Sequence, residues 1–99
     1  MDESSDGSST NKYKFMLFVS GMSVKSSHAI ENLRRICDQY LDNNYELEII
    51  DISRDTKEAL KHQIVAIPTL IKTNPAPRRI ILGDLSDKQK VLKILNIRE

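Results

Sequence analysis

The sequence predicts a single α/β domain with the element order βαβαββα. Short apolar runs that are typical of buried strands alternate along the chain with segments whose apolar residues recur at helical spacing. The chain has 99 residues, of which 39% are hydrophobic, which is enough for one modest core and too apolar for a disordered protein. We therefore expect one globular domain over residues 12–99.

An acidic, serine-rich tail, MDESSDGSSTN, precedes this domain as residues 1–11. It carries three acids and no base, and Met1 is its only apolar side chain, so it cannot bury enough surface to offset the entropy lost on ordering. We expect it to be disordered. It has no basic start and no apolar stretch of the kind found in secretory signals, and no later window is long enough to span a membrane. We expect a cytoplasmic protein with no membrane partner.

The first half of the domain predicts a strand, a helix and a second strand. YKFMLFVSG, from Tyr13, is an apolar and aromatic run of the kind that forms a strand buried on both faces. A helix over residues 26–42 follows, with Ser26 or Ser27 available to cap its first turn. Its apolar positions are Ile30, Leu33, Ile36, Cys37, Tyr40 and Leu41. YELEIIDIS alternates before it becomes apolar, which indicates a second strand with one less covered side.

The second half predicts a short helix, two strands and a last helix. Asp55, with Glu58 three residues later, is a capping-box-like start for a helix through about Gln63. IVAIPTLIK then gives a third strand entered through Pro68, NPAP gives a turn, and RRIILGD gives a fourth strand. The last helix is expected over residues 86–97, capped by Ser86, with an apolar face of Val91, Leu92, Ile94 and Leu95.

This order, with a proline at the entry of the third strand, resembles the thioredoxin-like fold, and IVAIPTLIK looks like its cis-proline loop. A thioredoxin carries its catalytic cysteines after the first strand, where this chain has SGMSVKSS. Cys37 is the only cysteine, so dithiol exchange is excluded, and we expect this residue to be a small buried hydrophobe. One cysteine and the distant His28 and His62 also offer no local ligand set, so we expect neither a metal nor a cofactor.

Four stretches together resemble the KaiB family of circadian clock proteins: FVSGMSVKSSHAIENL, IDISRD, AIPTLIK and NPAPRRIILGDLSDKQKVL. The resemblance covers residues 13 to about 95 and is most specific from Pro75 onward. It implies a non-enzymatic regulator that binds a KaiC-like ATPase in a circadian-clock or stress-response system. A KaiA-like protein or a sensor histidine kinase is a further implied partner. The resemblance also implies fold switching between a tetrameric ground state and a monomeric thioredoxin-like state. It is therefore compatible with a monomer, a dimer or a tetramer.

Four residues are candidate structural or switch positions: Pro68, Pro75, Pro77 and Ile94. X-Pro isomerisation is slow enough to gate a rearrangement, although the same prolines can simply shape their loops. VLKILNIRE lacks the glycine that KaiB proteins often carry there, which favours a terminal helix around Ile94 by up to about 1 kcal/mol per glycine replaced.

Charge is nearly balanced over the chain but unevenly placed. Fifteen lysines and arginines face fourteen acids, which gives no reason to expect nucleic-acid or membrane binding. Residues 72–99, however, carry seven bases and three acids. We expect Lys72, Arg78 and Arg79 to form a basic cluster around the NPAP turn that contacts carboxylates of a partner, with a merely solvated surface as the alternative. The few aromatic residues lie mostly in predicted core elements, so no stacking platform for nucleic acid is expected.

The second strand offers another surface. In a thioredoxin-like sheet it lies at an edge, so Glu46, Glu48 and Asp51 lie on a strand that can add a partner strand by main-chain pairing. The same charges are equally suited to keep an edge from aggregating. The competing function is a glutathione-binding protein or enzyme, in which Ser20 or Ser23 would stabilise a bound thiolate and the main chain of Ile67 would pair with the ligand.

Overall fold

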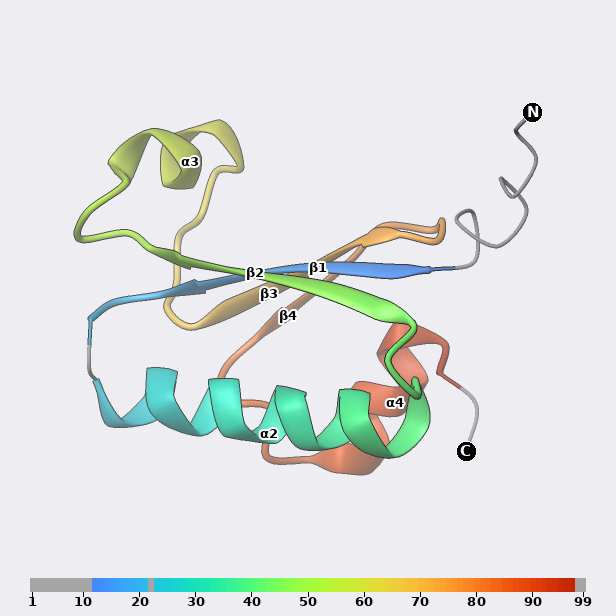
Figure 1. The fold of residues 1–99 in the computed structure, drawn as a ribbon. Helices are drawn as coiled ribbons and strands as arrows, with labels where there is room; N and C mark the ends of the chain where they lie inside the picture. The colour runs from blue at the N-terminus through green and yellow to red at the C-terminus, as the bar shows by residue number, and fades with distance from the viewer. Residues whose placement is uncertain (1–11, 22, 98–99) are drawn as a thin grey trace.

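The computed structural model describes residues 12–21 and 23–97, and the tail expected over residues 1–11 lies outside them. The observed order is the predicted βαβαββα (Figure 1). The elements are β1 (Tyr13–Val19), α2 (Val24–Tyr40), β2 (Tyr45–Asp51), α3 (Thr56–Lys61), β3 (Thr69–Asn74), β4 (Arg79–Leu82) and α4 (Lys88–Leu95).

The strands form one sheet in the order β2-β1-β3-β4. β1 and β2 run parallel, whereas β3 is antiparallel to both β1 and β4. At the centre of the sheet Leu17 pairs with Ile49 on one side and with Leu70 on the other. β2 therefore lies at an edge, as predicted from the sequence, and β4 forms the opposite edge.

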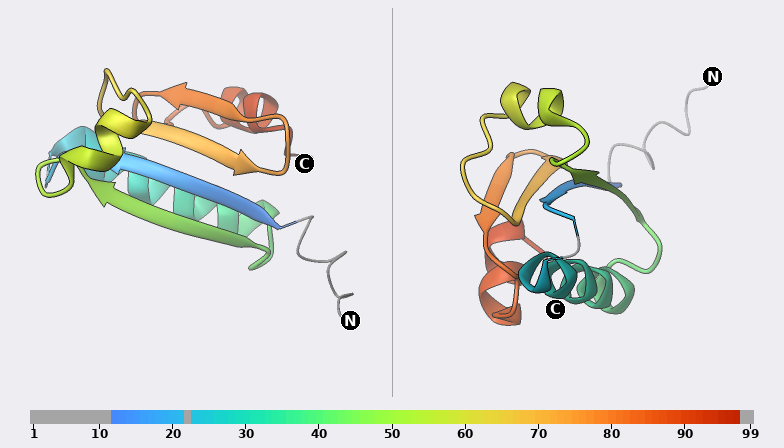
Figure 2. Two further views of the ribbon diagram at one scale, coloured as in Figure 1. Left: turned by 90° about the horizontal axis from the view of Figure 1, so that it is seen from above. Right: turned by 90° about the vertical axis from the view of Figure 1, so that its left-hand side faces the viewer.

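Helices cover the two faces of the sheet unequally. α2 and α4 lie against one face, whereas α3 lies over one end of the other face (Figures 1 and 2). The larger core lies between the sheet and α2 and α4, and Leu17, Leu33 and Leu70 are fully buried in it. A smaller cluster, on the other face, contains Phe18 and Ile71. Only part of that second face is therefore covered.

The caps of α2 and α3 show how local hydrogen bonds fix helix starts. The Oγ of Ser23 accepts a hydrogen bond from the N–H of Ser26 at 3.2 Å, so the helix begins at Val24. The prediction of Ser26 or Ser27 as the cap is wrong, because Ser26 is buried and its Oγ accepts from the N–H of Ser20. The predicted cap of α3 is confirmed, since the side chain of Asp55 accepts from the N–H of Glu58.

The cap of α4 is Asp87, whose side chain accepts from the N–H of Lys90, and not Ser86 as predicted. The predicted apolar face is confirmed: Val91, Leu92 and Leu95 are buried, and Ile94 packs against the same core.

β3 begins at Thr69, directly after Pro68, which confirms the predicted entry of the strand through this proline, although residues 64–67 of the apolar run lie outside the strand. These residues form a loop, and the strand instead extends to Asn74. The carbonyl of Pro68 accepts a hydrogen bond from the N–H of Gly83 at 2.9 Å, which ties the loop to the end of β4. The bond before Pro68 is cis, as are those before Pro75 and Pro77. A switching role for these prolines stays a prediction.

Candidate partner-binding surfaces

The place where a thioredoxin carries its thiols is occupied by a hydrogen-bonded serine loop. Ser23 caps α2, and Ser26 holds the main chain of Ser20. Cys37 lies farther along α2 and is fully buried, as predicted. Burial raises the pKa of its thiol to about 12, with a smaller contribution from the charge of Asp38. The thiol is therefore protonated at neutral pH and has little reactivity as a nucleophile.

The described residues offer no prepared metal site. Residues 12–21 and 23–97 contain no group of three histidine, cysteine, aspartate or glutamate side chains arranged around a common centre. None of the helices in this part of the chain has the length and apolar character needed to cross a membrane.

Lys72 does not belong to the surface cluster predicted for it. Its side chain is fully buried beneath α4, where its Nζ donates to the carbonyl of Leu95 at 3.1 Å and lies 5.8 Å from the ring centroid of Tyr13. Burial and the charge of Arg79 lower its pKa. The expectation of an exposed Lys72 is wrong, because the alternation of β3 places it on the same face as Leu70. Its role is to fasten α4 to the sheet.

Arg78 and Arg79 remain as an exposed pair at the start of β4. In the described part of the chain neither guanidinium belongs to an ion pair; the pairs there join Lys12 to Glu46 and His62 to Glu58. Two adjacent arginines that have no carboxylate partner among residues 12–21 and 23–97 are suited to contact acidic groups of a partner.

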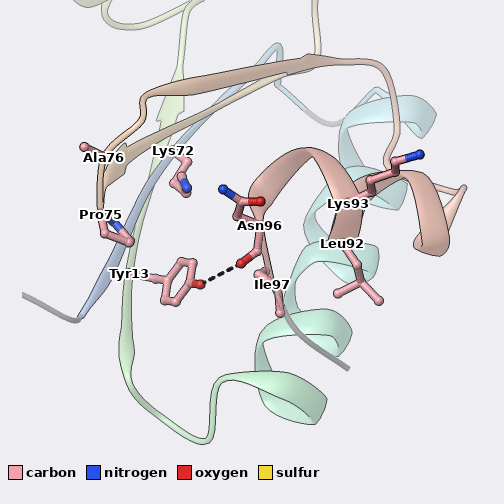
Figure 3. A pocket seen from close by; sticks show the side chains of 8 residues that line it. All are labelled: Tyr13, Lys72, Pro75, Ala76, Leu92, Lys93, Asn96 and Ile97. Atoms are coloured by element: carbon pink, nitrogen blue, oxygen red, sulfur yellow. Dashed lines mark hydrogen bonds between the residues drawn. The ribbon is translucent and has the colours of Figure 1, made fainter.

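A hollow of about 480 Å³ lies beside the β3–β4 turn, between that turn and the end of α4 (Figure 3). The hydroxyl of Tyr13 donates to the carbonyl of Asn96 across it at 3.2 Å. Tyr13 and Lys72 both donate to carbonyls at the end of α4, so these two polar side chains of the hollow are engaged in holding the helix. Its lining residues are Tyr13, Lys72, Pro75, Ala76, Leu92, Lys93, Asn96 and Ile97.

Two of the three acidic residues predicted for the β2 surface are exposed, and the third has another role. Glu46 and Glu48 are exposed, and the carboxylate of Glu46 lies 3.3 Å from the Nζ of Lys12. Asp51 instead has a structural role: its Oδ1 accepts hydrogen bonds from the N–H of Gly21 and from the N–H and Oγ of Ser53. These bonds, with that from the Ser53 hydroxyl the strongest, lower its pKa. Asp51 thus joins the β1–α2 loop to the end of β2.

Exposed apolar side chains form a feature that the sequence patterns missed. Leu60 on α3 is 79% exposed and Val65 in the following loop is 89% exposed. Ile80 and Leu82 are also exposed on β4. Leu82 pairs with Thr69, the first residue of the strand that follows the loop. The available signal was the shortness of α3, because a six-residue helix can bury little, and none of its residues is buried.

Solved structures show the thioredoxin-like fold. The chain resembles the N-terminal domain of Synechococcus elongatus SasA with a TM-score of 0.70 and 22% identity, over 90% of this chain and 88% of that one. It resembles a Fasciola hepatica thioredoxin with a TM-score of 0.71 and 11% identity, over 93% and 86% of the two chains. At these identities the likeness establishes the fold alone.

Sequence comparison adds the family. The model of the KaiB domain matches residues 16–97. A circadian clock protein KaiB3 from Synechocystis sp. is 41% identical over 87 residues, which cover 88% of this chain and 85% of that protein. A circadian clock oscillator protein KaiB from Gloeothece citriformis is 40% identical over 80 residues, which cover 81% and 76% of the two chains. The chain therefore belongs to the KaiB family.

Proposed function

We propose that this chain is a non-enzymatic regulator of a circadian-clock or stress-response system and that it acts by binding a KaiC-type ATPase. The observation that carries the proposal is the KaiB-domain match over residues 16–97, together with relatives that are named circadian clock proteins. The chemistry of the fold supports binding rather than catalysis, because serines replace the thioredoxin thiols and Cys37 is buried.

The contact surface that we propose for the ATPase combines the exposed arginines with the exposed apolar side chains. We call it the β4 surface. Leu60, Val65, Ile80 and Leu82 lie on the α3 side of the sheet, Arg78 directly precedes β4, and Arg79 lies on the same edge strand but on the face of Lys72. Apolar anchors beside arginines are typical of protein interfaces, because the apolar groups supply burial while guanidinium groups orient the partner. Arg78 and Arg79 are expected to meet carboxylates there.

The edge strand β2 is the proposed second surface. Its outer main-chain groups are available for pairing, and Glu46 and Glu48 favour a partner segment with basic residues. A KaiA-like protein or a sensor histidine kinase is the proposed occupant. The two surfaces lie at opposite edges of the sheet, so both can be engaged at once.

The test is to measure binding of the full chain to the KaiC-type ATPase from the same source, once with ATP and once with ADP. We expect saturable binding that depends on the nucleotide. Arg78→Ala with Arg79→Ala should weaken it by at least about tenfold, since truncating hydrogen-bonded charges at an interface costs several kcal/mol. Arg34→Ala with Arg35→Ala is the matched control for the loss of two positive charges, because these adjacent arginines are exposed on α2 and not on β4. Absence of binding in both nucleotide states would refute the proposal.

A glutathione titration distinguishes this proposal from the competing one, a glutathione-binding protein or enzyme. A glutathione-binding protein would show saturable thermal stabilisation at millimolar ligand, because a ligand that binds only the folded state raises its stability. We expect no such shift for this chain. The Oγ of Ser23 already accepts the capping N–H of Ser26, which reduces its capacity to hold a thiolate.

A further inference from the structure

β4 forms one edge of the sheet (Figure 2), and the alternation of its ladder determines which main-chain groups point outward. The N–H of Gly83 donates to the carbonyl of Pro68, just beyond the last pair of the ladder. Hydrogen-bonded pairs alternate with non-bonded pairs in an antiparallel sheet, so every second residue from Gly83 backward faces β3. The N–H and C=O groups of Ile80 and Leu82 therefore point away from the sheet. No other backbone hydrogen bond in the described part of the chain reaches them.

The side chains of Ile80 and Leu82 are also exposed, on the face of the sheet that carries α3. Ile80 pairs with Ile71 of the smaller cluster, and Leu82 pairs with Thr69. The exposed fractions of the two side chains are 48% and 58%. Natural edge strands are usually protected by charges, prolines or bulges, and β4 has none of these from Ile80 to Leu82. This edge is therefore suited to pair with another strand.

A second copy of the same strand fits this edge when it runs antiparallel about a two-fold axis at Ile81. Ile80 then lies opposite Leu82 of the second copy, and the same pair recurs on the other side of the axis. The outward N–H and C=O groups of both residues are thereby paired, which gives about four main-chain hydrogen bonds. The apolar side chains of the two copies meet on the α3 face, where cross-strand apolar pairs stabilise a sheet.

The charged residues that flank β4 complement one another in this register. Continuing it two positions beyond the apolar pair brings Arg78 toward Asp84 of the second copy. Arg78 has no ion-pair partner among the described residues, and the carboxylate of Asp84 accepts a hydrogen bond from the N–H of Ser86 at 3.1 Å. Opposite charges are therefore brought together. The β2 edge is unsuited to self-pairing, because an antiparallel copy there would place Glu46 opposite Glu48.

We propose that two copies of this chain associate through β4, in antiparallel register about Ile81, to form one continuous sheet. β4 has only four residues. The contact is therefore smaller than a standard interface and the dimer is weak, with a dissociation constant of about 0.1–1 mM. The dimer covers the edge of the β4 surface, so self-association competes with binding of the ATPase. This last consequence rests on the proposed function, whereas the dimer itself does not.

Sedimentation equilibrium of the full chain from about 0.05 to about 2 mM measures the association, because this range brackets the expected dissociation constant. Amide chemical shifts over the same range locate the contact. We expect the weight-average mass to rise toward that of a dimer and the concentration-dependent shifts to centre on residues 78–84.

Substitutions on the edge distinguish strand pairing from other modes of association. Leu82→Lys should raise the dissociation constant by at least about tenfold, because a charge on an edge strand opposes pairing, and Ile80→Lys is an independent second variant. Leu60→Lys is the matched control, since Leu60 is an exposed leucine on α3 and its replacement adds the same charge away from the edge strand. Arg78→Gln should weaken the dimer by about two- to thirtyfold, because it removes an exposed ion pair from each half of the interface. Arg34→Gln, which removes the same charge from α2, should leave the dimer intact.

Three results would overturn the proposal: a chain that stays monomeric over this range, shifts centred on β2 or on α3, or association that Leu82→Lys and Ile80→Lys leave unchanged. An equal loss in Leu60→Lys would also overturn it, because the copies would then meet through the apolar face and not through the strand edge. A dimer without any binding to the ATPase would refute the proposed function alone. Binding to the ATPase by a chain that remains monomeric would refute the dimer alone.

Discussion

Lys72 is a charged side chain buried beneath α4, and its burial affects both its pKa and the stability of the fold. Its ammonium has a carbonyl as its hydrogen-bond partner and the ring of Tyr13 nearby, while Arg79 adds a like charge. Removing a cation from water costs several kcal/mol, and a carbonyl and a ring offset that cost only in part. The lowered pKa expresses this imbalance, because it shows that the folded state disfavours the charged form.

We predict that Lys72→Met, which keeps the length of the side chain without its charge, leaves the free energy of unfolding at pH 7 within about 1 kcal/mol of the parent. Since the folded state releases the Lys72 proton at a lower pH than the unfolded chain, the unfolded chain binds more protons between the two pKa values. The parent should therefore gain stability relative to the variant as pH rises toward 10.5. Urea unfolding of both proteins from pH 7 to 10.5 measures this difference, and a relative loss by the parent would contradict the assignment.

Cys37 should show the opposite dependence on pH. Its pKa is raised from 9.0 to about 12 in the folded state, so its contribution to stability is fully present below pH 9 and is lost as pH rises toward 12. The loss approaches about 1.4 kcal/mol per pH unit within that window. Cys37→Ala removes this titration, so the gap in unfolding free energy between parent and variant should narrow above pH 9. A gap that stays constant would show that the thiol is already accessible to solvent.

The residues that sequence patterns placed wrongly are those whose environment is set by distant parts of the chain. Lys72 was expected at the surface, and its burial depends on a carbonyl 23 residues away. Asp51 was expected to face a partner, and it is bound by Gly21 from a loop 30 residues earlier. By contrast, the burial of Cys37 followed from helical spacing alone, because the repeat within one helix determines which side faces the core.

At the scale of elements, α4 shows that helix propensity predicts the presence of this helix but not where it ends. The absence of glycine favoured a helix in VLKILNIRE, and the structure has one. The helix nevertheless ends in the way that is usual for a C-terminal glycine, because Asn96 adopts φ 60°. The N–H of Asn96 donates to the carbonyl of Lys93, and the N–H of Ile97 donates to the carbonyl of Leu92. Asparagine tolerates this left-handed conformation, so it provides the stop that a search for glycine misses.

Ile94→Gly should destabilise the domain by about 2–4 kcal/mol, because it combines the helix cost of glycine with the loss of a side chain packed against the core. Lys93→Gly is the matched control, since Lys93 is exposed and should lose only the helix cost of about 1 kcal/mol. NMR secondary shifts over residues 88–95 and urea unfolding together measure the two effects. Equal losses in the two variants would show that Ile94 contributes no anchoring, and an unchanged helical population in Ile94→Gly would show that this segment does not determine the fold.

Elements were predictable wherever one face of a strand or helix is buried, and less so at their connections. The apolar runs of β1 and α2 located these elements within a few residues, because periodicity records burial. The run IVAIP has the composition of a strand, yet Val65 is 89% exposed in a loop. Composition alone cannot distinguish an apolar strand from an apolar contact surface. The β4 surface depends on which segments the fold brings together, so it could not be predicted from the sequence.

At the scale of the whole molecule, the sheet has edges of opposite charge, with Glu46 and Glu48 on β2 and Arg78 and Arg79 on β4. Because the two edges lie at opposite sides of the sheet, each favours a partner segment of the opposite charge. The consequence is measurable as a dependence of partner affinity on salt.

We predict that Arg78→Ala with Arg79→Ala weakens binding to the proposed KaiC-type ATPase by at least about tenfold at low ionic strength, because the two guanidinium groups are expected to meet carboxylates of the partner. The difference between the parent and this variant should shrink near 1 M salt, where exposed charges are screened within about 3 Å. Titration calorimetry of both proteins at low and at high salt measures this difference directly. A difference in affinity that is the same at both salt concentrations would mean that these arginines do not act through their exposed charge.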